Sequence, residues 1–443
     1  MFNIPVQVRT ALDMLSKNGY EAFIVGGCVR DFILGNIPYD YDITTNALPS
    51  QTEKVFENFR IIETGIKHGT VTVIIDHMPL EITTYRIDGE YADNRRPVSV
   101  SYTSRLADDL ARRDFTMNAI AYNHSSGLYD PFHGQDDIIK KQIICVGNPH
   151  ERFNEDALRI MRAVRFSSQL GFEIEKNTAE CIGKQKYLLK NISAERIRAE
   201  LDKLLTGKNV YNVLMNYSSV IEEFIPEIHN SIGFDQKSKY HIYTVWEHIA
   251  VAVSKACNDK IIRLALLLHD IGKPFSCQEE GNCRHFKGHA GKSADMAQKI
   301  LKRLKYENST SKRVITLISH HSDKFESEKA VKRCMSAIGS EAFFQLIEVQ
   351  KADNLAKKPF CAERIPKLEN IKRTAENLIK SKSCLNVKEL AVNGNDIKNA
   401  GFSGRDIGII LNKLLDEVIE NNISNEYEQL MQFVTEIKNN GQV

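Results

Sequence analysis

The sequence predicts an α/β head followed by an all-helical body, and three observations support this division. Short apolar runs bounded by Gly, Pro and Asp are frequent up to about residue 137, and such runs are typical of strands. Beyond that residue, apolar side chains recur at helical spacing to the end of the chain. The chain has 443 residues, 42% hydrophobic and 26% charged, which is long enough for several ordinary globular domains.

The composition restricts the class of protein. The formal net charge is only +2, so a surface that binds nucleic acid would have to be local. The nine cysteines are scattered and odd in number, which argues against a disulfide framework and for reduced thiols in a cytoplasm. We expect no signal peptide, because the N-terminus lacks the charged-then-apolar pattern, and no membrane span, because no apolar run approaches about 20 residues.

The head begins with two recognisable stretches. Residues 1–22 predict one amphipathic helix with Val8, Leu12 and Leu15 on one side. Residues 23–45, FIVGGCVRDFILGNIPYDYDITT, predict a strand, a Gly-Gly turn, a short helix, a loop and a second strand.

Asp40 and Asp42 are expected on the second of these strands. Alternate residues of a strand share a face, so both carboxylates would point the same way. Two such charges repel each other unless a cation lies between them, so the pair indicates a divalent-metal site facing the Gly-Gly turn. The pattern alone also fits two solvated aspartates at a strand edge.

The next elements add a third carboxylate and a loop. The runs GTVTVIID and PLEITTYR predict a hairpin with its turn at residues 77–79. Glu81 on the second run could join Asp40 and Asp42, or could be a solvated strand residue. The polar segment DGEYADNRRP, with Arg95 and Arg96, predicts a loop that could act as a lid over a metal site.

A helix predicted over residues 152–170 carries one Asp and three Arg at every third position: Asp156, Arg159, Arg162 and Arg165. Three arginines at this spacing repel one another unless an anion, such as a nucleoside triphosphate, lies along them. The alternative is a set of Asp–Arg pairs on a solvated face.

Asp156 and Arg159 could also select a base. A carboxylate accepts from an exocyclic amino group while a guanidinium donates to a ring nitrogen, and both cytosine and adenine offer that combination. Uracil and guanine present the reverse polarity and would leave both partners unpaired, which is costly in a buried site.

Five motifs in this order resemble those of the class II tRNA nucleotidyltransferases: GGCVRD (26–31), DYD (40–42), RRDFTMNA (112–119), EDALR (155–159) and SAERIRAEL (193–201). This family includes the CCA-adding enzymes and the bacterial poly(A) polymerases and belongs to the DNA polymerase beta-like superfamily. The resemblance covers roughly residues 20–205, and LAVNGNDI (390–397) is similar to the body and tail region of these enzymes.

The resemblance implies a transfer of nucleotides from CTP and ATP to a tRNA 3′ end, with the following roles. Asp40 and Asp42 would bind two Mg²⁺ ions, with Glu81 as a possible third catalytic carboxylate; Gly27, Arg30 and Arg113 would contact the nucleotide; Asp156 and Arg159 would read the base, supported by Arg162 and Arg165. The two arginines of the loop, Arg95 and Arg96, favour full CCA addition over CC-only or A-only addition, because the loop would help the pocket change from C to A.

A second set of residues lies in the helical body. His248, His269-Asp270 and Asp353 follow the H…HD…D order of the HD phosphohydrolase superfamily, which this block resembles. Neutral imidazoles and carboxylates from separate helices suit a divalent metal that activates water. His289, together with His320 or His321, could complete a two-metal version.

The expected domains are a nucleotidyltransferase head (1–144), a helical nucleotide- and RNA-binding region (145–230), an HD domain (231–360) and a helical body and tail (361–443). Two other functions stay open: a protein whose main activity is hydrolysis at the HD site, and a non-catalytic RNA-binding protein. A zinc cluster of Cys277, Cys283, His285 and His289 is disfavoured, because the spacing fits no common zinc module.

Overall fold

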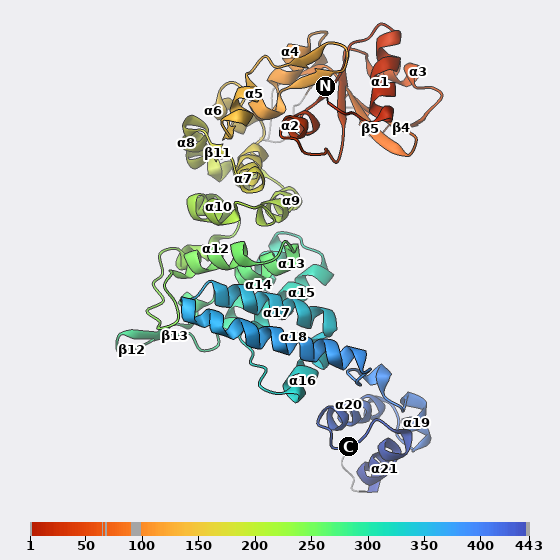
Figure 1. The fold of residues 1–443 in the computed structure, drawn as a ribbon, viewed down its shortest axis with the longest axis vertical. Helices are drawn as coiled ribbons and strands as arrows, with labels where there is room; N and C mark the ends of the chain where they lie inside the picture. The colour runs from red at the N-terminus through yellow and green to blue at the C-terminus, as the bar shows by residue number, and fades with distance from the viewer. Residues whose placement is uncertain (1, 64, 67–68, 90–98, 440–443) are drawn as a thin grey trace. The chain divides into compact units, whose positions relative to one another are not determined.

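The computed structural model describes residues 2–63, 65–66, 69–89 and 99–439, and it divides into two compact units, Met1–Pro226 and Glu227–Val443 (Figure 1). Along the chain, the division between the units falls close to the boundary expected between residues 230 and 231. None of the described helices is long and apolar enough to cross a membrane. Each unit is described below by itself.

The first unit begins with a seven-stranded sheet in the order β3-β4-β5-β2-β1-β8-β9. β2 and β5 pair in parallel, whereas the other neighbours pair antiparallel, so the predicted mixed sheet is confirmed. Its strands are β1 Ala22–Val25, β2 Asp42–Thr45, β3 Arg60–Ile62, β4 Thr70–Ile75, β5 Met78–Thr84, β8 Ala121–Asn123 and β9 Gly127–Tyr129. Two further pairs are β6 Arg86–Asp88 with β7 Val100–Tyr102, and β10 Gln142–Ile143 with β11 Glu173–Ile174.

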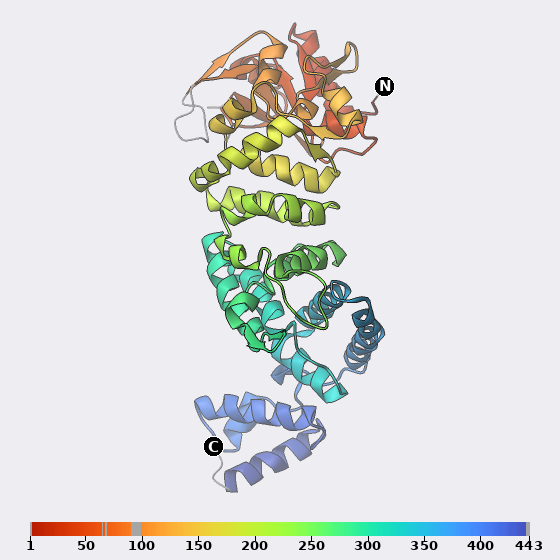
Figure 2. The ribbon, with the colours of Figure 1, turned by 90° about the vertical axis from the view of Figure 1, so that its left-hand side faces the viewer.

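The helices of this unit are α1 Val6–Lys17, α2 Gly27–Ile33, α3 Pro49–Val55, α4 Leu106–Ala111, α5 Gly134–Ile139, α6 Pro149–Glu155, α7 Leu158–Leu170, α8 Lys176–Gln185, α9 Ala194–Leu205, α10 Val210–Asn216 and α11 Ser218–Glu222. The predicted apolar face of α1, formed by Val8, Leu12 and Leu15, is fully buried. α7 packs against both α9 and α10, and the three lie side by side (Figure 2).

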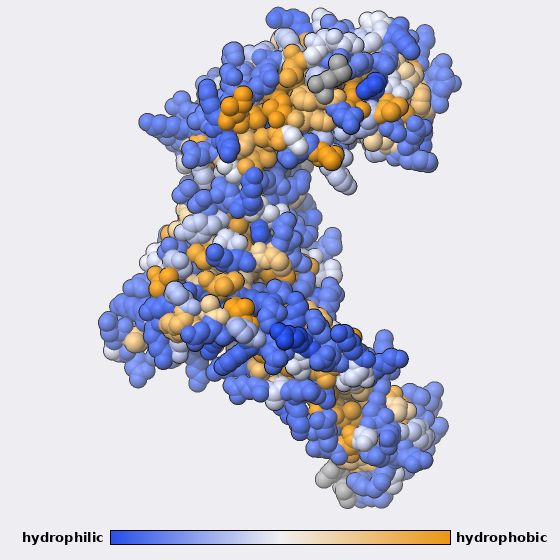
Figure 3. All heavy atoms as spheres, viewed as in Figure 1, coloured by the Kyte–Doolittle hydropathy of each residue, from blue (hydrophilic) through white to orange (hydrophobic). Residues whose placement is uncertain are grey.

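In the part of the second unit that the structure describes, helices predominate as predicted, and one short hairpin was not expected. Its helices are α12 Val245–Lys255, α13 Lys260–Leu268, α14 His289–Arg303, α15 Asn308–His320, α16 Glu328–Ile338, α17 Ser340–Leu355, α18 Ile365–Lys380, α19 Gly394–Asn399, α20 Arg405–Ile419 and α21 Tyr427–Asn439. The hairpin consists of β12 Gln278–Glu280 and β13 Cys283–His285. Helices α19–α21 enclose a core of their own that includes Ile397, Leu414 and Leu430. Hydrophilic residues predominate on the face drawn in Figure 3, and the apolar residues there gather mainly on the first unit, with smaller groups on the second.

Three predicted elements differ from the structure. The helix expected over 152–170 is broken, because Asp156 is extended (φ −133°, ψ 101°) and its carboxylate accepts a hydrogen bond from the Leu158 amide at 3.1 Å, as aspartates near helix starts do. The hairpin turns at Asp76 and His77 rather than at 77–79, because both residues adopt the positive φ that two-residue hairpin loops require. β2 starts at Asp42, so Asp40 precedes the strand instead of lying on it.

Candidate functional site

Asp42 lies at the start of β2, between its two neighbouring strands. Its register partner on β1 is Val25, and its partner on the parallel strand β5 is Glu81. Asp42 and Glu81 line one cavity of about 210 Å³ together with Arg112 and Arg113. The structure therefore places Glu81 directly beside Asp42.

The electrostatics around Asp42 suit a cation. Desolvation raises the pKa of Asp42; Arg113 opposes this rise, and Asp40 and Glu81 add to it. The ligand atoms of Asp40, Asp42 and Glu81, all three among the described residues, do not gather within 4.8 Å of one another. Such a separation is expected of like charges, which repel one another. A set of neighbouring carboxylates is also the kind of oxygen-donor set that divalent cations prefer. The residues present fit such an ion.

The Gly-Gly turn is packed against an arginine. Gly26 has φ +79°, and a Cβ added to it would lie 2.9 Å from the Nη1 atom of Arg113. Only glycine combines that backbone conformation with such a close approach. The structure thus singles out Gly26, whereas the sequence pointed to Gly27, which begins α2.

Arg30 on α2 is held in place by protein groups. Its Nη1 donates to Asn118 Oδ1 at 2.8 Å, and its Nη2 donates to Asp31 Oδ1 at 2.8 Å. Its guanidinium carbon also lies 5.0 Å from the centroid of the Phe166 ring on α7. These contacts connect the turn after β1 to the helix that carries the arginines.

The arginines of α7 are paired with carboxylates, so the expected repulsion between them does not arise. Arg159 Nη1 donates to Glu155 at 2.8 Å and its Nη2 to the Arg112 carbonyl at 2.8 Å. Arg162 donates to Asp114 through Nε at 2.7 Å, and Arg165 donates to Glu200 through Nε at 2.5 Å. These partners come from α6, α9 and the segment after α4, so the arginines do not by themselves require an anion along them.

Asp114 shows how strong this pairing is. Burial alone would raise the pKa of its carboxyl, but Arg162, a hydrogen bond from Asn118, and Arg159 bring the pKa to about 2. The carboxylate is therefore charged at neutral pH, and it fixes the α7 helix against the segment that follows Arg113.

Asp156 is paired with a residue that the sequence analysis missed. Arg196 on α9 donates to its two carboxylate oxygens, through Nη1 at 3.3 Å and Nη2 at 2.8 Å. Asp156 remains next to Arg159, whose amide donates to the Asp156 carbonyl at 3.0 Å. Arg196 lies within the SAERIRAEL motif, so its membership of that motif was the available signal.

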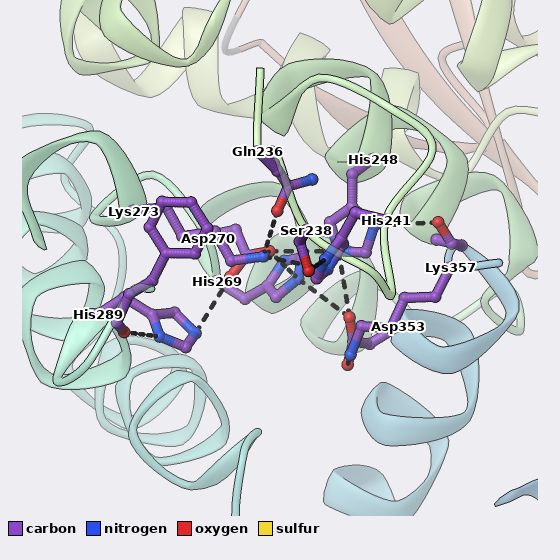
Figure 4. A network of polar contacts seen from close by, with 12 residues as sticks. Gln236, Ser238, His241, His248, His269, Asp270, Lys273, His289, Asp353 and Lys357 are labelled. Carbon is purple, nitrogen blue, oxygen red and sulfur yellow. Dashed lines mark hydrogen bonds and ion pairs between the residues drawn. The ribbon is translucent and has the colours of Figure 1, made fainter. Parts of the chain in front are cut away.

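The HD residues form a buried cluster in the second unit (Figure 4). His248 Nε2 lies 3.2 Å from Asp270 Oδ2 and 3.1 Å from Asp353 Oδ1. His269 Nε2 lies 3.2 Å from the same Asp270 oxygen. The ligand atoms of all four residues lie within 4.8 Å of one another, although they come from α12, the end of α13, and α17.

The atoms at the centre of this cluster lack hydrogen-bond partners. His248 Nε2, His269 Nε2 and both carboxylate oxygens of Asp270 are buried without one, although Asp270 Oδ2 forms an ion pair with Lys273 Nζ at 2.6 Å. The other ring nitrogens are held by backbone carbonyls, His248 Nδ1 by Ala356 at 3.1 Å and His269 Nδ1 by Leu266 at 2.7 Å. Buried orphan nitrogens whose rings are oriented from behind are typical of metal ligands, so the residues fit a divalent cation.

A second group shares Asp270 with the first. His289 Nε2 lies 3.3 Å from Asp270 Oδ1, and His321 Nε2 lies 3.7 Å from the same oxygen. Burial lowers the pKa of His321 to about 3, with His269 contributing, so its ring is the neutral form that binds metals. His320 does not belong here: its Nδ1 lies 2.7 Å from Asp323 instead, and His321 takes the expected place.

The cavity beside this cluster has a volume of about 740 Å³. Cationic and aromatic side chains line it together with the ligands: Lys273, Lys357, Arg364, Lys367, Phe286 and Phe325. Lys273 Nζ lies 2.6 Å from Asp270 and Lys357 Nζ lies 2.5 Å from Asp353, so two ammonium groups border the metal ligands. Such a lining suits a phosphorylated molecule.

Two further sets of residues named from the sequence are the loop arginines and the Cys/His group near the hairpin. Arg95 and Arg96 lie outside the described residues. Cys277, Cys283 and His285 form no metal-ligand group within the part of the chain that the structure describes, and His289 belongs to the group around Asp270.

Comparison with known proteins gives three family matches. Residues 22–144 match the family described as "Poly A polymerase head domain", residues 171–232 match "Probable RNA and SrmB- binding site of polymerase A", and residues 286–434 match tRNA nucleotidyltransferase domain 2. Together these matches extend over both compact units.

The relatives and solved structures agree with one another. The chain is 50% identical over 199 residues to the CCA-adding enzyme of Oceanobacillus iheyensis, covering 45% of this chain and 49% of that protein. It is 48% identical over 208 residues to that of Geobacillus kaustophilus, covering 47% and 51%. The matched segment thus spans about half the length of these relatives. The CCA-adding enzyme of Bacillus stearothermophilus in complex with CTP superposes with a TM-score of 0.75 at 28% identity, covering 98% of both chains.

Proposed function

We propose that this chain, which matches three domain families of tRNA nucleotidyltransferases and poly(A) polymerases, adds C and A nucleotides to the 3′ end of tRNA, completing CCA. The observation that carries this proposal is the pairing of Asp42 with Glu81, beside a glycine turn that Arg113 closes. The relatives at about half identity are named CCA-adding enzymes, which supports CCA addition over other members of the family.

In the proposed mechanism, Asp40, Asp42 and Glu81 would hold Mg²⁺, and the bound metal would supply Lewis-acid activation of the RNA 3′-hydroxyl and positive charge for the triphosphate. The turn at Gly26 and Gly27 lets backbone amides approach the phosphates closely. Arg113, positioned by Asp109 at 3.7 Å, supplies positive charge next to this turn.

Base selection is proposed to occur at the break between α6 and α7. Asp156 would accept from the exocyclic amino group of C or A, and Arg159 would donate to the adjacent ring nitrogen. Arg162 and Arg165 support this pair through their fixed positions on α7. Both oxygens of the Asp156 carboxylate already accept hydrogen bonds from Arg196. Arg196 must therefore share this carboxylate with the base or move away from it. Arg95 and Arg96 are proposed to assist the change from C to A.

The test is incorporation of labelled CTP and ATP into a tRNA that lacks its 3′ CCA, in the presence of Mg²⁺, resolved nucleotide by nucleotide. We expect two C residues and then one A, with no extension of tRNA that already ends in CCA. A product that stops after two C residues would make the protein a CC-adding enzyme, and A alone would make it an A-adding or poly(A)-forming one. No incorporation would reject the proposal.

We propose a metal-dependent phosphohydrolase activity at the HD site as a second function. The orphan nitrogens of His248 and His269 and the cationic cavity beside them favour it. A divalent metal bound there would supply an activated water. Lys357 and Arg364, which line the cavity, would neutralise the substrate phosphate.

This activity is tested with 2′,3′-cyclic nucleotides and phosphomonoesters in Mg²⁺, Mn²⁺ or Ni²⁺. Asp270→Ala removes a ligand shared by both groups, so we expect hydrolysis to fall about a hundred-fold or more. Asp295→Ala, on the exposed side of α14, is the matched control and should keep full activity. Hydrolysis unaffected by Asp270→Ala would mean that this site is not its source, and nucleotide addition should be unchanged in both variants.

We also propose that the protein acts in the cytoplasm. All nine cysteines are free thiols, which supports a reducing compartment, and the proposed tRNA, CTP and ATP partners are present there.

A further inference from the structure

Two adjacent histidines at the end of α15 belong to different groups. His321 faces Asp270 and His289, as described above. His320 instead has its Nδ1 atom 2.7 Å from Asp323 Oδ2. Cys334, on α16, completes a group with these two residues in which the ligand atoms all lie within 4.8 Å of one another.

Cys334 is the unusual member of this group. Its side chain is only 9% exposed, and no hydrogen bond to its thiol occurs among the described residues. Burial raises the pKa of the Cys334 thiol to about 12, and the nearby Asp323 carboxylate adds to the rise, so a thiolate at this place needs a cation beside it. The thiol, the imidazole and the carboxylate nevertheless converge on one point.

We propose that His320, Asp323 and Cys334 form a zinc site separate from the HD cluster. Nitrogen, oxygen and sulfur donors together favour zinc over magnesium or calcium, which prefer oxygen alone. One thiolate and one carboxylate would balance the charge of Zn²⁺. The ion would replace the proton between His320 and Asp323 and the proton of the thiol. The side chains of His320 and Asp323 are 35% and 42% exposed, which leaves room for water as a fourth ligand.

The site would brace one wall of the HD cavity. Residues 322–326, which include the ligand Asp323, all line that cavity and connect His320 at the end of α15 to the helix α16 that carries Cys334. The carbonyl of Asp323 accepts from Gln350 Nε2 on α17 at 2.9 Å, and α17 also carries Asp353. An ion that fixes His320 and Asp323 to α16 would therefore also fix the neighbouring His321.

The test uses Co²⁺ as the probe, titrated into the full-length reduced protein that has been freed of metals. Thiolate-to-cobalt charge transfer reports sulfur ligation, and the HD cluster contains no sulfur. We expect the charge-transfer band to saturate at the intensity of one thiolate-bound cobalt per chain, while the HD cluster takes up cobalt without such a band, and to disappear when Zn²⁺ is added. Absence of this band in the wild-type protein would overturn the proposal.

Variants identify the ligands. Cys334→Ser and His320→Ala should abolish the band, and His320 is exposed enough that its loss should leave the fold intact. Cys361→Ser, which removes another buried thiol of the same unit, and Asp270→Ala should both keep it. A band that persists in Cys334→Ser would reject the site. Because the readout is spectroscopic, the result does not depend on whether the protein adds nucleotides or hydrolyses phosphoesters.

Discussion

Replacing Asp42 by Asn is expected to reduce nucleotide incorporation by roughly a thousand-fold. The substitution keeps the shape of the side chain but removes the charge at the start of β2, beside Glu81. Desolvation raises the pKa of Asp42, Arg113 opposes the rise, and Asp40 and Glu81 add to it, so loss of its charge should not destabilise the fold. The measurement is the single-turnover rate of C addition at saturating CTP and tRNA.

Asp76→Asn is the matched control for this variant. Asp76 lies in the β4–β5 turn at φ 46°, a conformation that Asn adopts as readily as Asp, so both activity and stability should be unchanged. An Asp42→Asn variant that adds nucleotides within a few-fold of the wild-type rate would remove Asp42 from the catalytic residues.

Asp109→Ala is expected to destabilise the first unit by about 3–5 kcal/mol. The Asp109 side chain is fully buried and accepts from Arg112 Nε at 2.9 Å and from the Thr44 hydroxyl at 3.1 Å. Arg113 also forms an ion pair with it, so truncation leaves two guanidinium groups without this carboxylate, while the Thr44 hydroxyl keeps only the Thr83 carbonyl as its acceptor. The free energy of unfolding of this unit, from denaturant titration, measures the effect.

The adjacent Asp108 supplies the control. It is partly exposed and pairs with Thr103 and Arg105 near the surface, so Asp108→Ala should cost no more than about 1 kcal/mol.

The pH dependence of the free energy of unfolding gives a second check of the role of Asp109. Burial opposes ionisation of Asp109, but Arg112 and Arg113 hold its pKa below the ordinary value. The contribution of Asp109 to the free energy of unfolding is therefore complete above the unfolded-state pKa of about 4. It is lost as the pH falls through the lower folded-state pKa. Equal losses in the two variants would contradict this account.

The fold class follows from local patterns because it depends on spacing along the chain. The alternation in β4 and β5 and the apolar face of α1 are visible as residue periods, and the structure confirms both. The predicted element boundaries were wrong where a single polar side chain determines where a helix begins. Asp156 could continue a helix or start one, and its hydrogen bond to the Leu158 amide selects the second.

The site residues likewise include some that a sequence pattern identifies and some that it does not. His248, His269, Asp270 and Asp353 were identifiable because an ordered pattern marks them, and they converge in the structure. The partners of the α7 arginines were not identifiable, since Asp114 and Glu200 come from separate segments. The choice between His320 and His321 depends on a rotation of one residue at a helix end, which periodicity does not resolve.

The pairing of the α7 arginines has a consequence for ionic strength. Three guanidinium charges matched by three carboxylates attract few condensed counterions, so few are released when a nucleotide arrives. Contacts to the phosphate backbone of tRNA weaken steeply as salt rises, because their free energy comes largely from that release. If the protein binds tRNA as proposed, a rise in salt concentration should weaken tRNA binding well before it changes the selection between C and A.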